Sequence, residues 1–422
     1  MTNDNPAPAT HRSRAGVHAR SVIRFAMVVV LCAACDQAGG EDVARAVFRD
    51  SAGVRIAENP SPDDSAALPW WRFEGPLLDV GGEGVEEPYA LFRVSTAMRL
   101  ADGRVVVANG GSTDLRYYDA EGRHVATVGR SGEGPGEFRS VSMLMRGPGD
   151  SLTVYDIQAR RLSLISPEPE FIRDFTFGEP GGFGRLIGRT TSGEFVGQPT
   201  GFRGAPGEMP SGLVRMDQPV TLHSATGELV DTIGTFPGAE TFININTQGG
   251  QIASIEIRRL PFARSPSFAL TGDELYVGSQ DGPEISRYRL DGTMVLSIRT
   301  GRQPEPVTPE HLNAVIESRL ENAPPERHAE MRAVMEATPH GKQIPPYGSF
   351  TVDPSGNLWV ADHDDPLSTR GRFTVYGDDG GLLARIALPE RFRPFDIGED
   401  WILGLELDEL DVEHVRLYRI VK

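Results

Sequence analysis

Residues 128–139 read VGRSGEGPGEFR, and this glycine-rich stretch separates two strand-forming segments. Before it, residues 117–128 (YYDAEGRHVATV) carry apolar residues on both sides of a Glu-Gly turn, which predicts a β-hairpin. After it, residues 141–145 (VSMLM) begin another strand pattern. The order therefore predicts hairpins that follow one another and are joined by a crossing link.

Hairpins of the same kind recur along the chain, each with Gly, Asp or Asn at its turn and a β-branched or aromatic run after it. Six first hairpins cover residues 99–109, 146–156, 189–198, 269–279, 352–362 and 396–405. Second hairpins cover residues 117–128, 162–175, 222–233, 287–298 and 375–386. Two hairpins make one four-stranded blade, so the pattern predicts an all-β, six-bladed β-propeller over residues 51–422.

The last unit lacks its fourth strand, because residues 415–421 form a third strand pattern and only Lys422 follows. The missing strand pattern occurs near the beginning, at residues 77–82 (LLDVGG). An open sheet edge is an aggregation hazard that ring closure removes. We therefore expect this N-terminal strand to complete the last blade, whereas the partner of residues 54–57 is left open.

Two segments depart from the repeat. Residues 198–212 and 239–259 are rich in Gly, Pro, Asn and Gln and are expected to form loops. Residues 308–338, between the fourth and fifth blades, begin with Thr308-Pro309-Glu310, a helix start with a capping hydroxyl and proline in the first turn. This small helical insertion would either clip onto the face of the propeller or form a lid over the channel mouth.

The N-terminal segment is typical of an export signal. Several Arg and His residues precede the short apolar stretch at residues 25–34, which is too short to span a bilayer. Small residues lead to Cys35, as at the acylated cysteine of bacterial lipoproteins, although Cys32 stands where leucine is usual. We expect a lipoprotein signal peptide at residues 1–35, lipidation of Cys35 and a polar tether at residues 36–50. An ordinary secretory signal is the alternative.

Composition restricts the partners. The formal net charge is −17, which argues against binding to nucleic acid or to an anionic membrane surface. Cys32 and Cys35 are the two cysteines of the chain, so no disulfide is expected in the mature protein. We expect a monomer of the cell envelope that is exported and lipid-anchored, with the membrane contacted through the lipid alone.

The link at residues 132–138 (GEGPGEF) resembles the G-x-G-P-G-E-F link that precedes blades in NHL-type repeats. Together with the six hairpins, it makes residues 51–422 similar to bacterial six-bladed β-propeller lipoproteins related to NHL proteins. The resemblance implies the propeller fold and a lipid anchor. Most members of such families have no assigned activity, so it implies no reaction.

Motifs of known chemistry are absent from the sequence. It holds no H-E-x-x-H, G-x-S-x-G or P-loop pattern, and no thiol outside the export signal. The acidic run at residues 362–365 (DHDD) could supply metal ligands, but nothing at fixed spacing completes a coordination shell, so it is interpreted as a solvated loop. We predict no catalytic residue, no metal site and no cofactor.

A recurrent pair of phenylalanine and arginine precedes four of the blades. The pairs are Phe92-Arg93, Phe138-Arg139, Phe262-Ala263-Arg264 and Phe392-Arg393. Because the first strand of each blade lines the central channel, we expect the phenylalanines to pack between blades and the arginines to gather at one channel mouth. Guanidinium groups placed together bind carboxylates or phosphates. The alternative is that each arginine pairs with an acidic neighbour, as Glu137 could with Arg139.

Two functions remain open from the sequence. One is a membrane-tethered, extracytoplasmic propeller that binds a partner protein or a small anionic ligand at the channel mouth, without catalysis. The other is a propeller hydrolase or lyase similar to lactonases, strictosidine synthase or peptidyl-hydroxyglycine lyase. Lactonase-type sites use Glu, Asn and Asp from separate inner strands, whereas the positions before these blades offer Arg, Phe, Ser and Tyr. The comparison favours binding.

Overall fold

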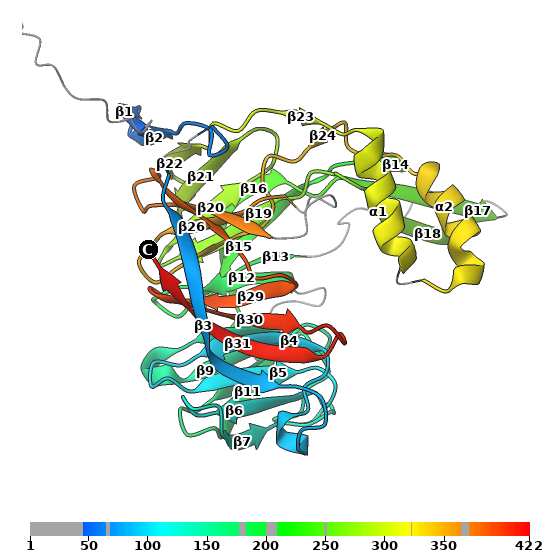
Figure 1. Ribbon diagram of the computed structural model, residues 1–422. Helices are drawn as coiled ribbons and strands as arrows, with labels where there is room; N and C mark the ends of the chain where they lie inside the picture. The colour runs from blue at the N-terminus through cyan, green and yellow to red at the C-terminus, as the bar shows by residue number, and fades with distance from the viewer. Residues whose placement is uncertain are drawn as a thin grey trace, which may run out of the picture. The chain divides into compact units, whose positions relative to one another are not determined.

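The computed structural model describes residues 45–64, 68–176, 183–199, 209–248, 251–321, 323–363 and 371–422, and it consists mainly of short antiparallel strands (Figure 1). The lipidation prediction at Cys35 and the signal peptide lie outside these residues. Each predicted first hairpin is present, because alternating apolar side chains are followed by a turn that reverses the chain.

The strands pair in groups of four. The first group holds β4 (Val94–Arg99), β5 (Val105–Asn109), β6 (Asp114–Tyr118) and β7 (His124–Val128). The second holds β8 (Val141–Arg146), β9 (Leu152–Asp156), β10 (Arg161–Ile165) and β11 (Phe171–Thr176). The third holds β12 (Phe183–Arg189), β13 (Phe195–Pro199), β15 (Asp217–His223) and β16 (Leu229–Pro237).

Three further groups follow along the chain. The fourth holds β19 (Ser267–Thr271), β20 (Glu274–Gly278), β21 (Glu284–Arg289) and β22 (Met294–Arg299). The fifth holds β25 (Phe350–Val352), β26 (Leu358–Ala361), β27 (Arg372–Tyr376) and β28 (Leu382–Ala387). The sixth holds β29 (Phe392–Ile397), β30 (Trp401–Leu407), β31 (Glu413–Val421) and the N-terminal strand β3 (Trp70–Gly81).

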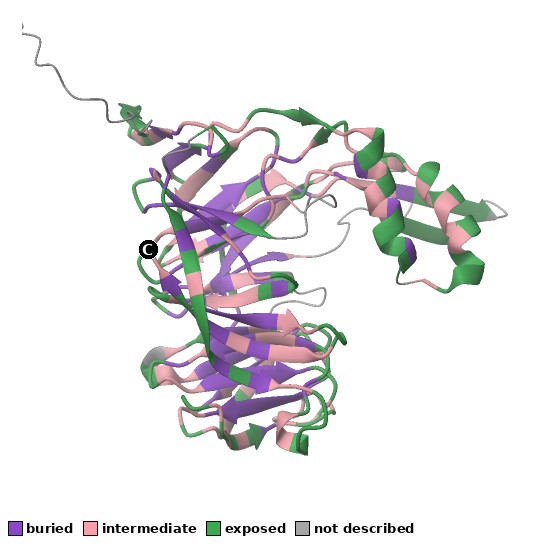
Figure 2. Cartoon of the chain, in the orientation of Figure 1, coloured by how far each residue is buried: buried purple, intermediate pink, exposed green. Residues whose placement is uncertain are grey.

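Buried residues are concentrated on the strands (Figure 2), and the apolar ones form clusters between successive groups. Among the described residues, apolar clusters join the first group to the second, the second to the third, and so on around to the sixth and the first. The first strands also neighbour one another, since β4 contacts β8 and β29, and β19 contacts β12 and β25. Sheets that face each other in cyclic order with first strands innermost define a β-propeller, which confirms the predicted fold class.

β3 closes the ring as predicted. It pairs antiparallel with β31, with Val80 opposite Val415 and Leu78 opposite Leu417. Its first residues also pair in parallel with β28 of the fifth group. The side chains of Leu78 and Val80 are buried in the cluster between the sixth and first groups. One strand thus satisfies two sheet edges and contributes to the core between the ends of the chain.

The partner of residues 54–57 is now defined. β2 (Val54–Glu58) adds to the fourth group by parallel pairing with β22, and β1 (Val47–Ser51) pairs antiparallel with β2. β1 begins inside the segment expected to be an unstructured tether. The reason is the two-residue turn at Ala52 and Gly53, both at positive φ, which closes a hairpin.

The expected loop at residues 239–259 is instead a β-hairpin. β17 (Thr241–Gln248) pairs with β18 (Gln251–Arg259), and β14 (Gly212–Val214) adds a third strand. Isoleucines alternate with polar residues on both strands, as in the cross-strand pair of Ile243 and Ile257. This period of two outweighs the Gly- and Asn-rich composition that suggested a loop. Residues 200–208 of the other expected loop lie outside the described part of the chain.

The helical insertion is present between the fourth and fifth groups, as predicted. A two-residue ribbon of β23 (Glu305–Pro306) and β24 (Gln343–Ile344) encloses α1 (Pro309–Glu321) and α2 (His328–Glu336). Thr308 stands before α1, and its hydroxyl accepts a hydrogen bond from the backbone N–H of His311 at 3.4 Å. Within the described residues, no helix is long and apolar enough to span a membrane.

The glycine-rich link between the first and second groups is fixed by Phe138. This ring is fully buried, and its backbone N–H donates to the Arg130 carbonyl at 2.8 Å. Gly129 has φ +85° and lies so close that a Cβ there would be 2.3 Å from the Phe138 ring. Glycine is required at this position both by the backbone conformation and by the close approach.

Ring closure by β3 predicts opposite outcomes for two adjacent leucines. Leu78 is 5% exposed in the closing core, whereas Leu77 is 52% exposed. We expect Leu78→Ala to lower the free energy of unfolding by about 2–5 kcal/mol because it leaves a cavity. Leu77→Ala should change it by less than about 0.5 kcal/mol. Urea denaturation of both variants measures the difference, and equal losses would show that this register is incorrect.

Candidate ligand-binding site

The four arginines predicted to form a ring occupy four different positions relative to the first strands. Arg93 lies one residue before β4, Arg139 two before β8, Arg264 three before β19, and Arg393 is the second residue of β29. Because side chains alternate along a strand and loops follow their own geometry, the repeated sequence pair does not give equivalent directions. The pattern is regular in sequence but not in structure.

Their contacts differ accordingly. The Arg393 guanidinium donates to the Val94 carbonyl at 2.8 Å and lies 4.7 Å from the centroid of the Phe395 ring. The structure therefore brings Arg393 beside the segment that holds Arg93, whose own guanidinium lies over the Phe92 ring. Arg139 forms an ion pair with Glu133 at 3.0 Å. Ligand binding by Arg93, Arg139 and Arg393 stays a prediction.

Phe138, Phe262 and Phe392 are buried as expected, but Phe92 is 59% exposed. The expected packing of Phe92 is wrong because Leu91 takes the buried position. The segment before β4 is therefore shifted by one residue relative to the segment before β8. Asn109 accepts a hydrogen bond from the Phe92 N–H, whereas the equivalent Asp156 accepts one from the Arg139 N–H.

Glu137, the acid considered as a partner for Arg139, forms its contacts with other groups. Glu137 forms its ion pair with Arg130, at 2.7 Å, rather than with Arg139. It also accepts a hydrogen bond from the Gly134 N–H at 2.8 Å. The Glu137 side chain is thereby held inside the glycine-rich link. Arg139 forms its ion pair with Glu133 instead.

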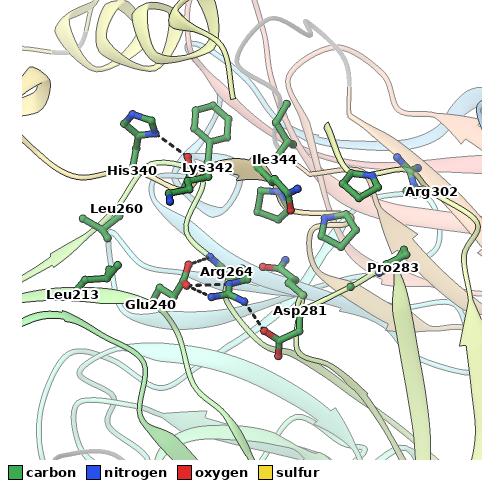
Figure 3. Close-up of a pocket in the computed structure, with 18 residues that line it drawn as sticks. Leu213, Glu240, Leu260, Arg264, Asp281, Pro283, Arg302, His340, Lys342 and Ile344 are labelled. Atoms are coloured by element: carbon green, nitrogen blue, oxygen red, sulfur yellow. Dashed lines mark hydrogen bonds and ion pairs between the residues drawn. The ribbon is translucent and has the colours of Figure 1, made fainter. Parts of the chain in front are cut away.

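Arg264 lines a cavity of about 450 Å³, which is within the size range of ligand pockets (Figure 3). Its walls come from the loop before β19, the loop between β20 and β21, the segment after β22, and the loop that follows α2. The apolar part of the lining is formed by Leu213, Leu260, Phe262, Pro283, Pro304, Ile344, Pro345 and Pro346. The third-unit insertion and the helical insertion thus both contribute to one pocket.

Both carboxylates of the pocket are held by arginines. Glu240 accepts from Arg264 Nε at 2.9 Å and from the Arg264 backbone N–H at 2.9 Å. Asp281 accepts from Arg264 Nη1 at 2.6 Å and also pairs with Arg215. Burial raises the pKa of each carboxyl, but hydrogen bonds and the nearby arginine charges outweigh burial, so both pKa values lie below their usual range. Both groups are ionised and paired at neutral pH.

Gln280 fixes the floor of the pocket. Its side chain is 6% exposed, and its amide oxygen accepts from the Ser265 N–H at 2.6 Å. Its amide nitrogen donates to the Tyr347 carbonyl at 2.5 Å, and the Tyr347 hydroxyl donates to the Glu284 carbonyl at 2.8 Å. The loop before β19 is thereby tied to the segment before β25, so the pocket is preorganised.

Phe262 connects the pocket to the helical insertion. Its ring lies 5.9 Å from that of His311 in α1 and 5.8 Å from that of His363. The N–H of Gly341 donates to the Pro261 carbonyl at 2.9 Å, and a Cβ at Gly341 would lie 1.9 Å from the Phe262 carbonyl oxygen. Only glycine allows this approach, which places the next residue, Lys342, in the wall of the pocket.

Lys342 is the pocket cation that no pattern in the sequence predicts. Its side chain is exposed and forms no ion pair with any described residue, whereas the other lining cations, Arg264 and Arg302, both have carboxylate partners. One signal could have drawn attention to it: Lys342 and Lys422 are the two lysines among the 42 lysine and arginine residues of the chain. Lysine presents a compact charge on a mobile stem.

The acidic run at residues 362–365 is described in part, since residues 364 and 365 lie outside the described ranges. Asp362 is surrounded by arginines, forming ion pairs with Arg302, Arg372 and Arg385. Its carboxylate is therefore engaged by cations of the protein itself. In the portion of the chain that is described, no group of three or more His, Cys, Asp or Glu residues is placed to hold a metal ion.

No known protein family and no curated protein matches the chain. Among solved structures it is similar to a Bacteroides fragilis protein described as exported, at 11% identity and a TM-score of 0.49, over 87% of this chain and 100% of that one. It is also similar to a Xanthomonas campestris gluconolactonase (12%, TM-score 0.39, 78% and 87%) and a Staphylococcus aureus virginiamycin B lyase (10%, TM-score 0.39, 82% and 99%). The site itself must therefore carry the functional assignment.

The lowered pKa of Glu240 predicts a pH dependence. Its folded pKa lies below the ordinary value of 4.5, so its contribution to stability is complete above that value and is lost as the pH falls through the folded pKa. We expect Glu240→Gln to be less stable than the wild type at pH 7 and to approach it near pH 3. Glu256→Gln, which removes an exposed pair with Arg258, should change little at either pH. Chemical denaturation measures both, and a pH-independent loss at Glu240 would contradict the assignment.

Proposed function

We propose that the protein is an envelope-anchored binding propeller whose pocket, lined by Arg264 and Lys342, takes a small anionic molecule. The observation that carries the proposal is a charge imbalance. Glu240 and Asp281 are neutralised by arginines, while the Lys342 ammonium lies in the wall without an ion-pair partner among the described residues. An anion would supply the missing countercharge, and the proline-rich wall would cover its apolar part.

Binding is favoured over catalysis by the state of the pocket acids. A general acid must hold a proton near neutral pH, and a general base is most effective with a pKa near the working pH. The pKa values of Glu240 and Asp281 lie below their ordinary range, and the oxygens of both accept hydrogen bonds from arginines. A lactonase, strictosidine-synthase or peptidyl-hydroxyglycine-lyase reaction would need groups that are free to exchange protons.

The binding proposal is tested with the purified full-length chain and four probes: inorganic phosphate, glycerol 3-phosphate, succinate and glutarate. We expect at least one of them to raise the melting temperature, and calorimetry then gives its affinity. Lys342→Gln should weaken that affinity about tenfold or more, because it removes a charged hydrogen-bond donor. Lys422→Gln is the matched control and should bind as the wild type does.

Lysine chemistry provides a second measurement in the same protein. With Lys342 and Lys422 as its two lysines, amine acetylation followed by mass spectrometry reports each site separately. The bound anion should slow acetylation of Lys342 but not of Lys422. Equal protection at both lysines, equal affinity in both variants, or no stabilising probe would contradict the proposal.

We also propose that the chain is exported and held at the membrane by acylation of Cys35. Small residues before this cysteine and the short apolar stretch support the assignment. Cys35→Ser should release the protein from the membrane fraction or leave the signal uncleaved, which fractionation and mass spectrometry measure. Cys32→Leu, which restores the residue usual at that position, is the control and should remain membrane-bound. Unchanged size and membrane attachment of Cys35→Ser would contradict acylation.

A further inference from the structure

A second cavity, of about 320 Å³, lies among the first strands of four successive groups. Its lining comes from β8, β12, β19 and β25, represented by Met143, Arg185, Phe268 and Thr351. Because first strands surround the central axis of a propeller, this cavity is a section of the channel. Among the described residues, it shares no lining residue with the pocket around Arg264 and Lys342.

The accessible surface of the cavity is more polar than apolar and carries positive charge. Ile187, Leu270 and Val352 supply its apolar part, and none of the lining residues that the structure describes is a carboxylate. The charged side chains among its described lining residues are Arg185 and Arg189.

Arg189 is directed toward its own hairpin rather than into the channel. Its guanidinium lies 5.9 Å from the centroid of the Phe195 ring. Its Nη2 atom would be 2.9 Å from a Cβ at Gly193, the glycine of the turn between β12 and β13. Arg185 is therefore the cation available to the cavity.

Arg185 has no countercharge among the described residues: it forms no ion pair and no side-chain hydrogen bond there, and its closest aromatic contact is Phe268 at 5.9 Å. Burial lowers the pKa of Arg185, and the positive charge of Arg259 lowers it further. An arginine remains charged despite such a shift. The Arg185 side chain is nevertheless exposed to solvent, so the folded protein holds an accessible cation that the charge of Arg259 repels, a combination that an anion would relieve.

Arg259 extends this positive region. It ends β18 and, together with Arg319 of α1, lines another cavity of about 320 Å³. Neither Arg259 nor Arg319 forms an ion pair with a residue that the structure describes. Three arginines without acidic partners therefore lie on β12, β18 and α1, and Arg185 is the one that lines the channel.

We propose that the channel cavity binds a small monocarboxylate. The planar guanidinium of Arg185 matches a carboxylate in a two-point hydrogen bond, and the side chains of Ile187, Leu270 and Val352 offer contacts to a short apolar part of the ligand. A cavity of about 320 Å³ is at the lower end of the range for ligand pockets, which favours a small acid. A free metabolite or the C-terminus of a peptide with an apolar last residue could supply this group.

The test uses the purified full-length chain and calorimetry with 3-phenylpropanoate, with 3-phenylpropanamide as the uncharged analogue. We expect the acid to bind with one-to-one stoichiometry and the amide not to bind. Arg185→Gln should weaken the acid about tenfold or more, whereas Arg173→Gln, on the outer strand β11, should not. Lys342→Gln should leave this binding unchanged, which separates the channel from the pocket proposed above.

Thermal unfolding without ligand provides a readout of the unpaired charge itself. Arg185→Gln should melt at a higher temperature than the wild type, because it removes the charge repulsion between Arg185 and Arg259. Arg185→Lys keeps the positive charge, so it should still bind the acid, although more weakly than the wild type. It is also the most conservative of the variants and serves as a control for folding. A pentapeptide with a C-terminal leucine tests whether the carboxylate comes from a peptide, and its C-terminal amide is the control. Tighter binding of the peptide acid than of 3-phenylpropanoate assigns the site to a protein terminus.

Three results would overturn the proposal. The first is the absence of binding by both the small acid and the peptide acid. The second is equal affinity in the wild type and Arg185→Gln. The third is a lower melting temperature of the ligand-free Arg185→Gln variant. Loss of binding in the pocket variant Lys342→Gln alone would assign the carboxylate to that pocket and remove it from the channel.

Discussion

Every strand at the edge of a sheet presents backbone N–H and C=O groups that need a partner, and β3 meets this need for two sheets at once. Along one edge it pairs with β31, and at its beginning it pairs with β28. The apolar residues Leu78 and Val80 then fill the space between the last and first groups. The cyclic arrangement of the core, and with it the position of every loop, depends on this one strand.

A closed ring of rigid sheets leaves chemical variation to the segments inserted between strands. The pocket around Arg264 is formed where two insertions meet the fourth group, and Phe262 connects them through His311 and the close approach of Gly341. The arginines that hold Glu240 and Asp281 preorganise its polar side. The channel cavity, by contrast, is built from the first strands themselves, so its shape follows from the fold.

The sequence predicts features that depend on neighbouring residues. Hairpins follow from turn glycines and alternating side chains, and the closing strand follows from the repeat that it completes. The hairpin of β17 and β18 was obscured by Asn- and Gly-rich composition, although its isoleucines alternate. The two cavities depend on residues that are distant in sequence. Arg264 pairs with Glu240 across the insertion, and the approach of Gly341 to Phe262 places Lys342. Arg185 stands out because it lines the channel without an acidic partner among the described residues. No local pattern encodes such pairings.

The closing contact joins residues that are far apart in the chain: Asp79 and His414, linked at 2.8 Å across β3 and β31, are 335 positions apart. Pairing over such a separation forms late in folding, so both edges stay open until then. During that interval a β3 strand can also join the β31 of a second molecule, in competition with its own. At high protein concentration the same geometry therefore favours strand-exchanged oligomers, in which each ring is completed by its neighbour.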